Sequence, residues 1–436
     1  MDPQEVLEQA RKVAQEAETF HLYRKEEPVV FEANRLKRVE QRETSGVALR
    51  IIRDGRIGFS STTDDKGLRS LIDNAAEMLP FGPQAFLTFP GPQPYGDVQV
   101  YDPSVEALSL DDMVNLGQSA IDGLRRHTPD LLCNATVSRS VTTLSIYNTR
   151  GAEAQYTRSA FSVFVEGELI RDTDMLFVWD GESTCHPISD ISPIVDSVVQ
   201  QLDRSRKIVP APTGEVPVLF TPHGVTEALL TPLLAGLNGR AVVKGASPLV
   251  GKLGTRVLDE KLSLYDDPTL PFVPGSRICD DEGVVSRRVH LVEDGTVSSF
   301  LYDLQTAAQA GAESTGSGHR GLSSMPGPAA SVLVLREGES SEEEMLADIR
   351  RGVVVEHLLG AGQSNVQGGE FSANVLLGYL VENGRIEGRI KNTVIAGNVY
   401  TVLREIRGVA RDSRWVGGTV RAPALWCGGV SVASKG

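Results

Sequence analysis

Apolar and polar residues follow two alternating patterns in the first part of this 436-residue chain. Apolar residues recur at helical spacing over 2–19, where Asp2 is placed to cap, and the pattern predicts a helix there. Alternation over 35–63, with an Asp-Gly turn at 53–56, predicts strands joined by a hairpin. A second helical pattern over 65–79 completes one α-β-α unit.

The same order of patterns follows a Pro/Gly-rich connector at 89–104. Residues 109–127 predict a helix, 133–170 predict strands, and 191–207 predict another helix. We therefore predict a duplicated α-β-β-β-α pattern whose two halves share one sheet.

The second half of the chain is dominated by short strands and turns. The segment 208–220 is a second linker, so we place the domain boundary there, with an N-terminal α+β domain at 1–207 and a C-terminal β-rich domain at 208–436. Gly-containing turns at 293–296 and 382–385 predict hairpins. One helix is expected after Ser341, which forms a capping-box pattern with Glu344. The predicted fold class is α+β, with helices packed on an antiparallel sheet in the N-terminal domain and few helices in the C-terminal domain.

Composition limits the partners and the compartment. A formal net charge of -14 argues against general binding to nucleic acid or to anionic membranes, since both are negative. No run of 18 apolar residues occurs, and the N-terminus is charged, so we expect a cytoplasmic protein. The four cysteines form no Cys-x-x-Cys pair, which predicts buried reduced thiols rather than disulfides or a zinc finger.

A search for catalytic chemistry finds only weak patterns. No two of the seven histidines lie within six residues, so no single helix supplies a zinc-peptidase motif. A metal site built from distant histidines stays open, but a surface or hydrogen-bonded role is favoured for each. The glycine-rich loop 314–321 offers His319 and Arg320 to hold a carboxylate or carbonyl, with a plain turn as the alternative. The loop 245–254 lacks the order of a phosphate-binding loop and is rejected.

Several longer segments together resemble the TldD/PmbA family, in particular its TldE (PmbA) branch. The resemblance covers nearly the whole chain and is carried best by the C-terminal blocks at 239–257, 279–316, 378–388 and 392–398. It implies a two-domain α+β fold and a dimer. In this family a TldD-type subunit binds a catalytic metal, zinc or a similar divalent ion, through a His-Glu-x-x-x-His helix and a later cysteine. Its TldE-type partner lacks these ligands, and the heteromer is a cytosolic metalloprotease for unstructured peptides, including leader peptides.

The resemblance can be carried over residue by residue. Leu230, Thr231 and Ala235 match the first histidine, the glutamate and the second histidine of the motif, and none of them can bind a metal or activate water. The segment matching the family's metal-binding cysteine, 413–423, contains no cysteine, and Cys427 lies beyond it. We therefore expect no catalytic residue and no metal ligand in this chain.

The function that this predicts is a non-catalytic TldE/PmbA-like subunit that helps to form the substrate chamber and position an extended peptide. The many short strands offer a route, since an exposed strand edge can bind a peptide backbone by strand addition. Candidate substrate- or partner-contacting residues are Asn238, Arg240, His319 and Arg320, for which a structural role at a turn or dimer contact fits equally. One alternative is a stand-alone homodimeric peptide-binding or scaffold protein, and another is a hydrolase built on His319. The natural peptide, and the choice between general proteolysis and maturation of one product, stay open.

Overall fold

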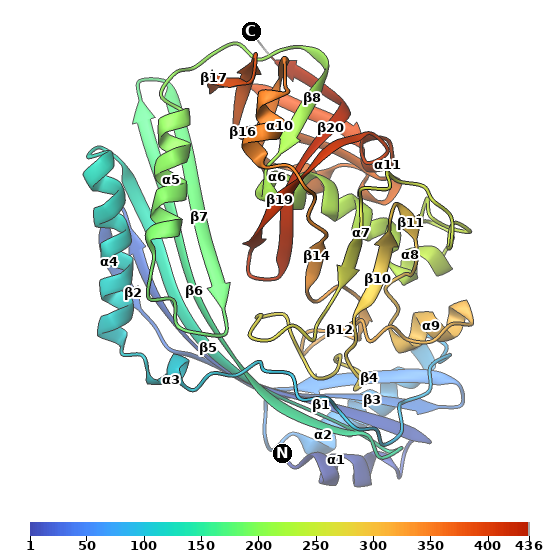
Figure 1. Cartoon of the computed structure of the whole chain (residues 1–436). Coiled ribbons are helices and arrows are strands. Elements are labelled where there is room, and N and C mark those ends of the chain that lie inside the picture. Colours follow the sequence, from blue (N-terminus) through green and yellow to red (C-terminus); the bar gives the residue numbers. More distant parts are fainter. Residues whose placement is uncertain (435–436) are drawn as a thin grey trace.

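A long, curved antiparallel sheet forms the N-terminal part of the computed structural model, which describes residues 1–434 (Figure 1). Its seven strands run in the order β4-β3-β1-β5-β6-β7, with β2 paired to β1. Their bounds are β1 Glu16–Glu32, β2 Arg35–Val39, β3 Arg42–Arg53, β4 Arg56–Thr62, β5 Leu132–Asn148, β6 Glu153–Arg171 and β7 Asp174–Thr184.

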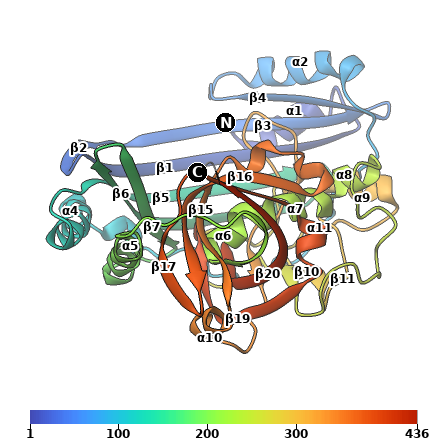
Figure 2. The same ribbon diagram turned by 90° about the horizontal axis from the view of Figure 1, so that it is seen from above.

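Helices cover the outer face of this sheet, and the C-terminal domain lies against the inner face (Figures 1 and 2). The helices are α1 Pro3–Ala10, α2 Leu68–Met78, α3 Ser104–Ala107, α4 Leu110–His127 and α5 Ser192–Arg204. The duplicated α-β-β-β-α pattern in one shared sheet is confirmed, since β1 of the first half pairs with β5 of the second.

The helix predicted over 2–19 is too long. It ends at Ala10, and residues from Glu16 onward belong to β1. The helical spacing of the apolar residues continues past the real end by coincidence, whereas Thr19 and Phe20 favour a strand. Pairing with β3 on one side and β5 on the other then satisfies the backbone groups of the segment.

Period-two alternation divides the sheet into two faces with different tasks. Odd-numbered residues of β5 and β6 pack under α4 and α5, as in Cys133, Ala135, Val137, Phe161, Val163 and Val165. Even-numbered residues at one end of the sheet, Phe20, Leu144, Ile146 and Ala154, pack against Cys279 of the C-terminal domain. At the other end the even-numbered positions of β1, β5 and β6 carry mostly polar residues and line a cavity instead.

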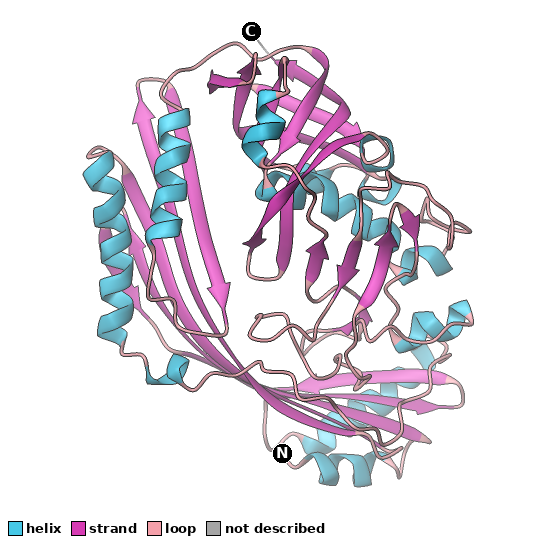
Figure 3. Ribbon diagram, viewed as in Figure 1, coloured by secondary structure: helices cyan, strands magenta, loops and turns pink. Residues whose placement is uncertain are grey.

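The C-terminal domain is built on an eleven-stranded mixed sheet in which β8, β15, β16, β18 and β20 close into a ring, because β20 pairs with both β18 and β8. The strands are β8 Gly214–Phe220, β9 Leu264–Asp266, β10 Val289–Glu293, β11 Thr296–Val297, β14 Leu333–Leu335, β15 Arg351–Leu359, β16 Glu370–Glu382, β17 Arg385–Arg389, β18 Thr393–Asn398, β19 Ile406–Val416 and β20 Val420–Ser434. A separate two-stranded ladder joins β12 Gly318–His319 to β13 Gly327–Pro328. The helices, cyan in Figure 3, are α6 Pro222–Gly224, α7 Thr231–Leu237, α8 Gly239–Val243, α9 Leu304–Ala310, α10 Glu342–Ala347 and α11 Val399–Val402.

Local signals in the sequence are confirmed at the turns and caps. The pairs Asp54-Gly55, Asp294-Gly295 and Asn383-Gly384 all have positive φ, as two-residue hairpin loops require. Ser341 and Glu344 form the expected capping box of α10. All four cysteines are free and buried. Among the described residues, no helix has the length and apolar character needed to span a membrane.

The apolar run at 224–239 forms a helix with a widened turn. Val225–Leu230 is π-helical, and the α-helical segment Thr231–Leu237 follows directly. Pro232 is the second residue of that segment. Proline has no N–H to donate and its ring crowds the carbonyl four residues earlier, so a widened turn before it accommodates the ring without breaking the helix.

Asp266 at the end of β9 links stability to pH. Its Oδ1 accepts hydrogen bonds from the Ser331 and Val332 N–H groups at 2.9 and 2.7 Å, and burial raises its pKa to about 6. The folded state therefore holds this proton more tightly than the unfolded chain does, and the stabilisation is complete below about pH 4 and lost as the pH rises through 6. A shift of about two pKa units corresponds to about 3 kcal/mol.

We expect Asp266→Asn, which keeps an acceptor for both N–H groups, to remove this dependence. The free energies of unfolding of the natural chain and the variant are measured in urea from pH 4 to 7. As the pH rises over this range, the natural chain should lose about 3 kcal/mol relative to the variant. A difference that stays constant over this range would contradict the assignment.

Candidate functional site

Four buried charged side chains join the two domains. Arg50 of β3 contacts Glu18 of β1 and Glu282 of the C-terminal domain, both at 2.7 Å, and Arg320 reaches Glu18 from the C-terminal side at 2.7 Å. None of the four side chains is more than 3% exposed. The Arg320 guanidinium also lies 4.4 Å from the ring centroid of Phe20. Charges this deeply buried are tolerated only when each is paired, so the network fixes how the domains meet.

Two aspartates accept hydrogen bonds from the backbone of the glycine-rich loop 314–321. Asp280 Oδ2 accepts a hydrogen bond from the Gly318 N–H at 2.8 Å, and Asp281 Oδ2 accepts one from the Arg320 N–H at 2.9 Å. Burial raises the pKa of Asp280 to about 6. Burial acts in the same direction on Asp281, but the hydrogen bond from His319 and the charge of Arg277 lower the pKa of that carboxyl.

The structure brings all four sequence-predicted site residues around the β12–β13 ladder. The Asn238 side chain caps α8 and donates to the Pro328 carbonyl at 2.8 Å, and Arg240 donates to the Pro326 carbonyl at 3.1 Å. His319 is 63% exposed and pairs with Asp281 at 3.2 Å. Arg320 differs from the other three, because its guanidinium is fully buried against Glu18 and has no access to solvent.

The helix positions that the sequence resemblance assigns to the family's metal motif are Leu230, Thr231 and Ala235. Leu230 is buried in the core of the C-terminal domain, Thr231 is exposed, and Ala235 is half-buried. A methyl, an isobutyl and a hydroxyl group do not supply the imidazole and carboxylate donors that zinc prefers. These residues therefore do not fit the metal that the resemblance implies.

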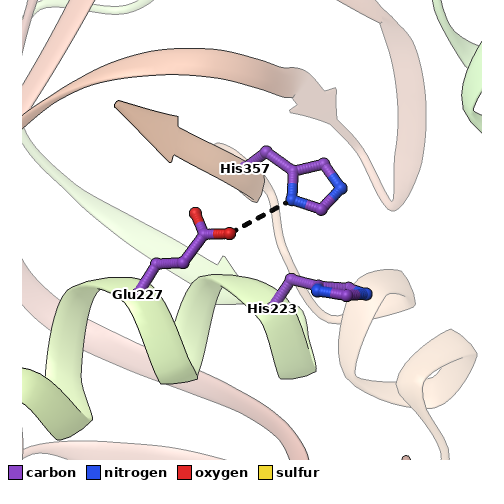
Figure 4. A group of neighbouring side chains, drawn as sticks. All are labelled: His223, Glu227 and His357. Atoms are coloured by element: carbon purple, nitrogen blue, oxygen red, sulfur yellow. Dashed lines mark hydrogen bonds and ion pairs between the residues drawn. The ribbon is translucent and has the colours of Figure 1, made fainter. Parts of the chain in front are cut away.

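Potential ligands do lie earlier on the same helical segment. His223 of α6, Glu227 of the π-helical turn and His357 of β15 point toward one another, with ligand-type atoms all within 4.8 Å (Figure 4). His357 Nδ1 is 3.3 Å from Glu227 Oε1, and the Leu358 N–H donates to Glu227 Oε2 at 2.6 Å. The two imidazole centroids are 4.7 Å apart.

Residues of the N-terminal sheet enclose this cluster from the other side. Trp179 of β7 stacks on the His357 ring with a centroid separation of 3.6 Å, and Asp180 Oδ1 lies 3.5 Å from His223 Nε2. Arg414 of β19 pairs with Asp180 at 2.6 Å. Burial alone would raise the pKa of Asp180, but the hydrogen bond with His223 and the charge of Arg414 lower it, so this carboxylate stays ionised at neutral pH.

Two adjoining cavities connect the cluster to the inner face of the sheet. One, of about 310 Å³, is lined by His223, Glu227, Trp179 and apolar side chains. The other, of about 430 Å³, is lined by arginines and hydroxyl groups, namely Arg24, Arg38, Arg42, Thr136, Ser138, Ser140, Ser162 and Ser183. Both share Ser162 and Ser183, so we treat them as one trough, defined by these lining residues. Guanidinium and hydroxyl groups at one end can bind carbonyls and carboxylates, and the other end offers imidazole and carboxylate.

Histidine spacing alone does not reveal this cluster. No second histidine follows His223 along the helix, and its partner there is a glutamate four residues later. That spacing is a weak signal, because His–Glu pairs on helices are common surface features. His357 joins only because β15 pairs with β8 in parallel immediately before the helix begins, which the sequence pattern does not specify.

The chain matches two family models, and it resembles other proteins in sequence and in fold. Residues 213–434 match the model of the PmbA/TldA metallopeptidase C-terminal domain, and residues 17–79 match that of the PmbA/TldA metallopeptidase domain 1. An uncharacterized protein of Methanocaldococcus jannaschii is 24% identical over 93% of this chain and 94% of its own length. A metalloprotease of Methanothermobacter thermautotrophicus is 25% identical over 88% of this chain and 86% of its own length. The crystal structure of TldE from Thermococcus kodakarensis superposes with a TM-score of 0.90 and 25% identity, covering 99% of each chain.

The buried network yields a stability prediction. Replacing Arg320 by Met leaves Glu18 with one fewer partner in a site without water, and we expect the free energy of unfolding to fall by about 3 to 5 kcal/mol. Arg256→Met, which breaks an exposed pair with Glu260, should cost at most about 1 kcal/mol. Denaturant unfolding of both variants provides the measurement. Equal effects of the two substitutions would mean that the network does not hold the domains together.

Proposed function

Because the chain belongs to the PmbA/TldD family of metallopeptidases, we propose that it is the TldE-like, non-catalytic subunit of a heteromeric metallopeptidase. The observation that carries the proposal is that the chain has the fold of this family but lacks metal-ligand side chains at the positions that the resemblance assigns to the motif. The fold matches a TldE structure over 99% of the chain, while Leu230, Thr231 and Ala235 stand at the positions of the motif ligands. In this proposal a TldD-type partner supplies the catalytic metal, and the complex acts in the cytoplasm.

The trough supports a role in holding an extended peptide. Its basic end carries Arg24, Arg38 and Arg42 and one acidic lining residue, Glu26. Arg24 pairs with Glu26, and Arg38 and Arg42 share Glu40, so this end keeps a small excess of positive charge. Hydroxyl groups on the even-numbered positions of β5 and β6 can donate to backbone carbonyls whatever the peptide sequence. We propose that unfolded peptides or leader peptides lie along this trough and pass from it to the metal centre of the partner.

Side-chain contacts are the proposed mode of peptide binding, in preference to strand addition at β7. At the middle of that edge the Gln201 side chain accepts from the Trp179 N–H at 3.1 Å and donates to the Trp179 carbonyl at 2.9 Å. The amide thus occupies the hydrogen-bonding groups that an added strand would use. The wall of the trough offers hydroxyl groups instead, together with the exposed guanidinium groups of Arg24, Arg38 and Arg42, which pair with Glu26 and Glu40.

The proposal predicts that activity needs two chains. The purified protein alone should not cleave an unfolded peptide, and an equimolar mixture with a TldD-type subunit should cleave it in a chelator-sensitive way. Native mass spectrometry of the mixture should show the mixed oligomer. Persistent homodimers with no mixed species would favour the peptide-binding scaffold, and robust cleavage by the lone chain would overturn the non-catalytic assignment.

Charge reversal in the trough tests the peptide-binding step. We expect Arg24→Glu to raise the KM of the mixed enzyme several-fold for an acidic unfolded peptide, with kcat little changed, because the residue contributes binding that is equal in the ground and transition states. The effect should shrink as salt increases. Arg256→Glu, outside the lining of the trough, serves as the matched control. Equal KM values for the two variants would exclude the basic end of the trough as part of the peptide path.

A further inference from the structure

We infer that His223, Glu227 and His357 form a binding site for one divalent transition-metal ion, of which zinc is the best match. The site lies on the first turns of the helical segment, before Leu230, and uses none of the positions that match the family's motif. It is therefore a metal site of this chain in addition to the one proposed for the partner subunit.

The donor set favours zinc over magnesium or calcium. Two imidazoles and one carboxylate are typical zinc ligands, whereas Mg²⁺ and Ca²⁺ prefer oxygen donors throughout. Bonds of about 2.0 to 2.2 Å in a tetrahedral site bring ligand atoms to about 3.4 Å from one another. The His357–Glu227 pair is already at 3.3 Å, and the longest separation between ligand atoms, 4.8 Å, needs to contract by about 1.4 Å to reach tetrahedral spacing. Rotation of the side chains supplies a movement of that size.

The surroundings hold the ligands in place. The Leu358 N–H fixes one oxygen of Glu227 and leaves the other free, and stacking on Trp179 fixes the plane of His357. Asp180 lies at Nε2 of His223, which leaves Nδ1 of that ring as a donor. In zinc sites a ligating histidine commonly bonds to a carboxylate through its other ring nitrogen, which orients the ring and increases its basicity.

His357 is the most deeply buried member of the cluster. Its side chain is fully buried and its Nδ1 lies 3.3 Å from Glu227 Oε1, so a nitrogen of the ring already faces the carboxylate of the proposed site. The cluster also has access, since Glu227 is 28% exposed and lines the cavity of about 310 Å³ together with His223.

Three protein ligands leave coordination positions open. In zinc proteins this pattern accommodates a water molecule or a group of the substrate. The open side faces the trough, so the carbonyl or carboxylate of a peptide lying there fits the vacant position. The metal would then anchor one end of the peptide, and its binding can be measured without any cleavage assay.

The test uses the full-length chain without a polyhistidine tag, freed of metal by chelator and dialysed. Isothermal titration with Zn²⁺ should give one site per chain, and Mg²⁺ should not compete. Glu227→Gln keeps the size of the side chain and an acceptor for the Leu358 N–H but removes the charged ligand, and should weaken zinc binding at least tenfold. His223→Gln should do the same, and His290→Gln, at an exposed histidine outside the cluster, should bind as the natural chain does.

Cobalt(II) substitution gives a second readout, because a nitrogen-ligated four-coordinate ion has visible absorption bands that the Glu227 variant should lose. Thermal unfolding of each variant confirms that it is folded before titration. Absence of zinc binding by the natural chain, or equal binding by the natural chain and both cluster variants, would overturn the inference. These outcomes are separate from the proposed subunit role, which depends on cleavage by the mixed enzyme.

Discussion

The buried network of Glu18, Arg50, Glu282 and Arg320 determines how the two domains meet. Four charges without access to water are stable only in one arrangement in which each finds its partner, so the network allows little sliding of one domain over the other. The apolar contact of Phe20 with the C-terminal domain lies beside the network. It buries further surface area, but apolar contacts do not depend on direction and so constrain the relative orientation of the domains less. One end of the inner sheet face is thereby sealed, and the other end stays open as the trough.

The geometry of the trough follows from this arrangement. The three members of the cluster all belong to the C-terminal domain, and β7 of the N-terminal sheet brings Trp179 and Asp180 against them. A rotation of one domain against the other would separate the stacked rings of Trp179 and His357. The charged network is therefore part of what holds β7 against the cluster, although none of its members lines the trough.

Local patterns in the sequence predicted local structure well, as the Asp-Gly and Asn-Gly turns and the Ser341 cap show. They failed where tertiary pairing overrides spacing, as in residues 16–19, where pairing with neighbouring strands overrides an apparently helical pattern. The cluster could not be predicted either. Glu227 and His357 are separated by 130 residues, and their contact depends on the parallel pairing of β8 with β15. The order of strands in such a ring depends on the whole domain, and the spacing of apolar residues along the sequence does not reveal it.

The helical segment 222–237 carries both the positions that the resemblance assigns to the metal motif and two members of the cluster, His223 and Glu227. Its π-helical turn precedes Pro232, and widened turns of this kind are often found at functional sites because they redirect the side chains before them. The turn contains Glu227 of the proposed metal site and Leu230, the first position that the resemblance matches to the motif, and Pro232 follows directly after Thr231. The proposed ligand and the proline therefore belong to one continuous helical segment, and its widened turn is where we expect a change of backbone to affect both.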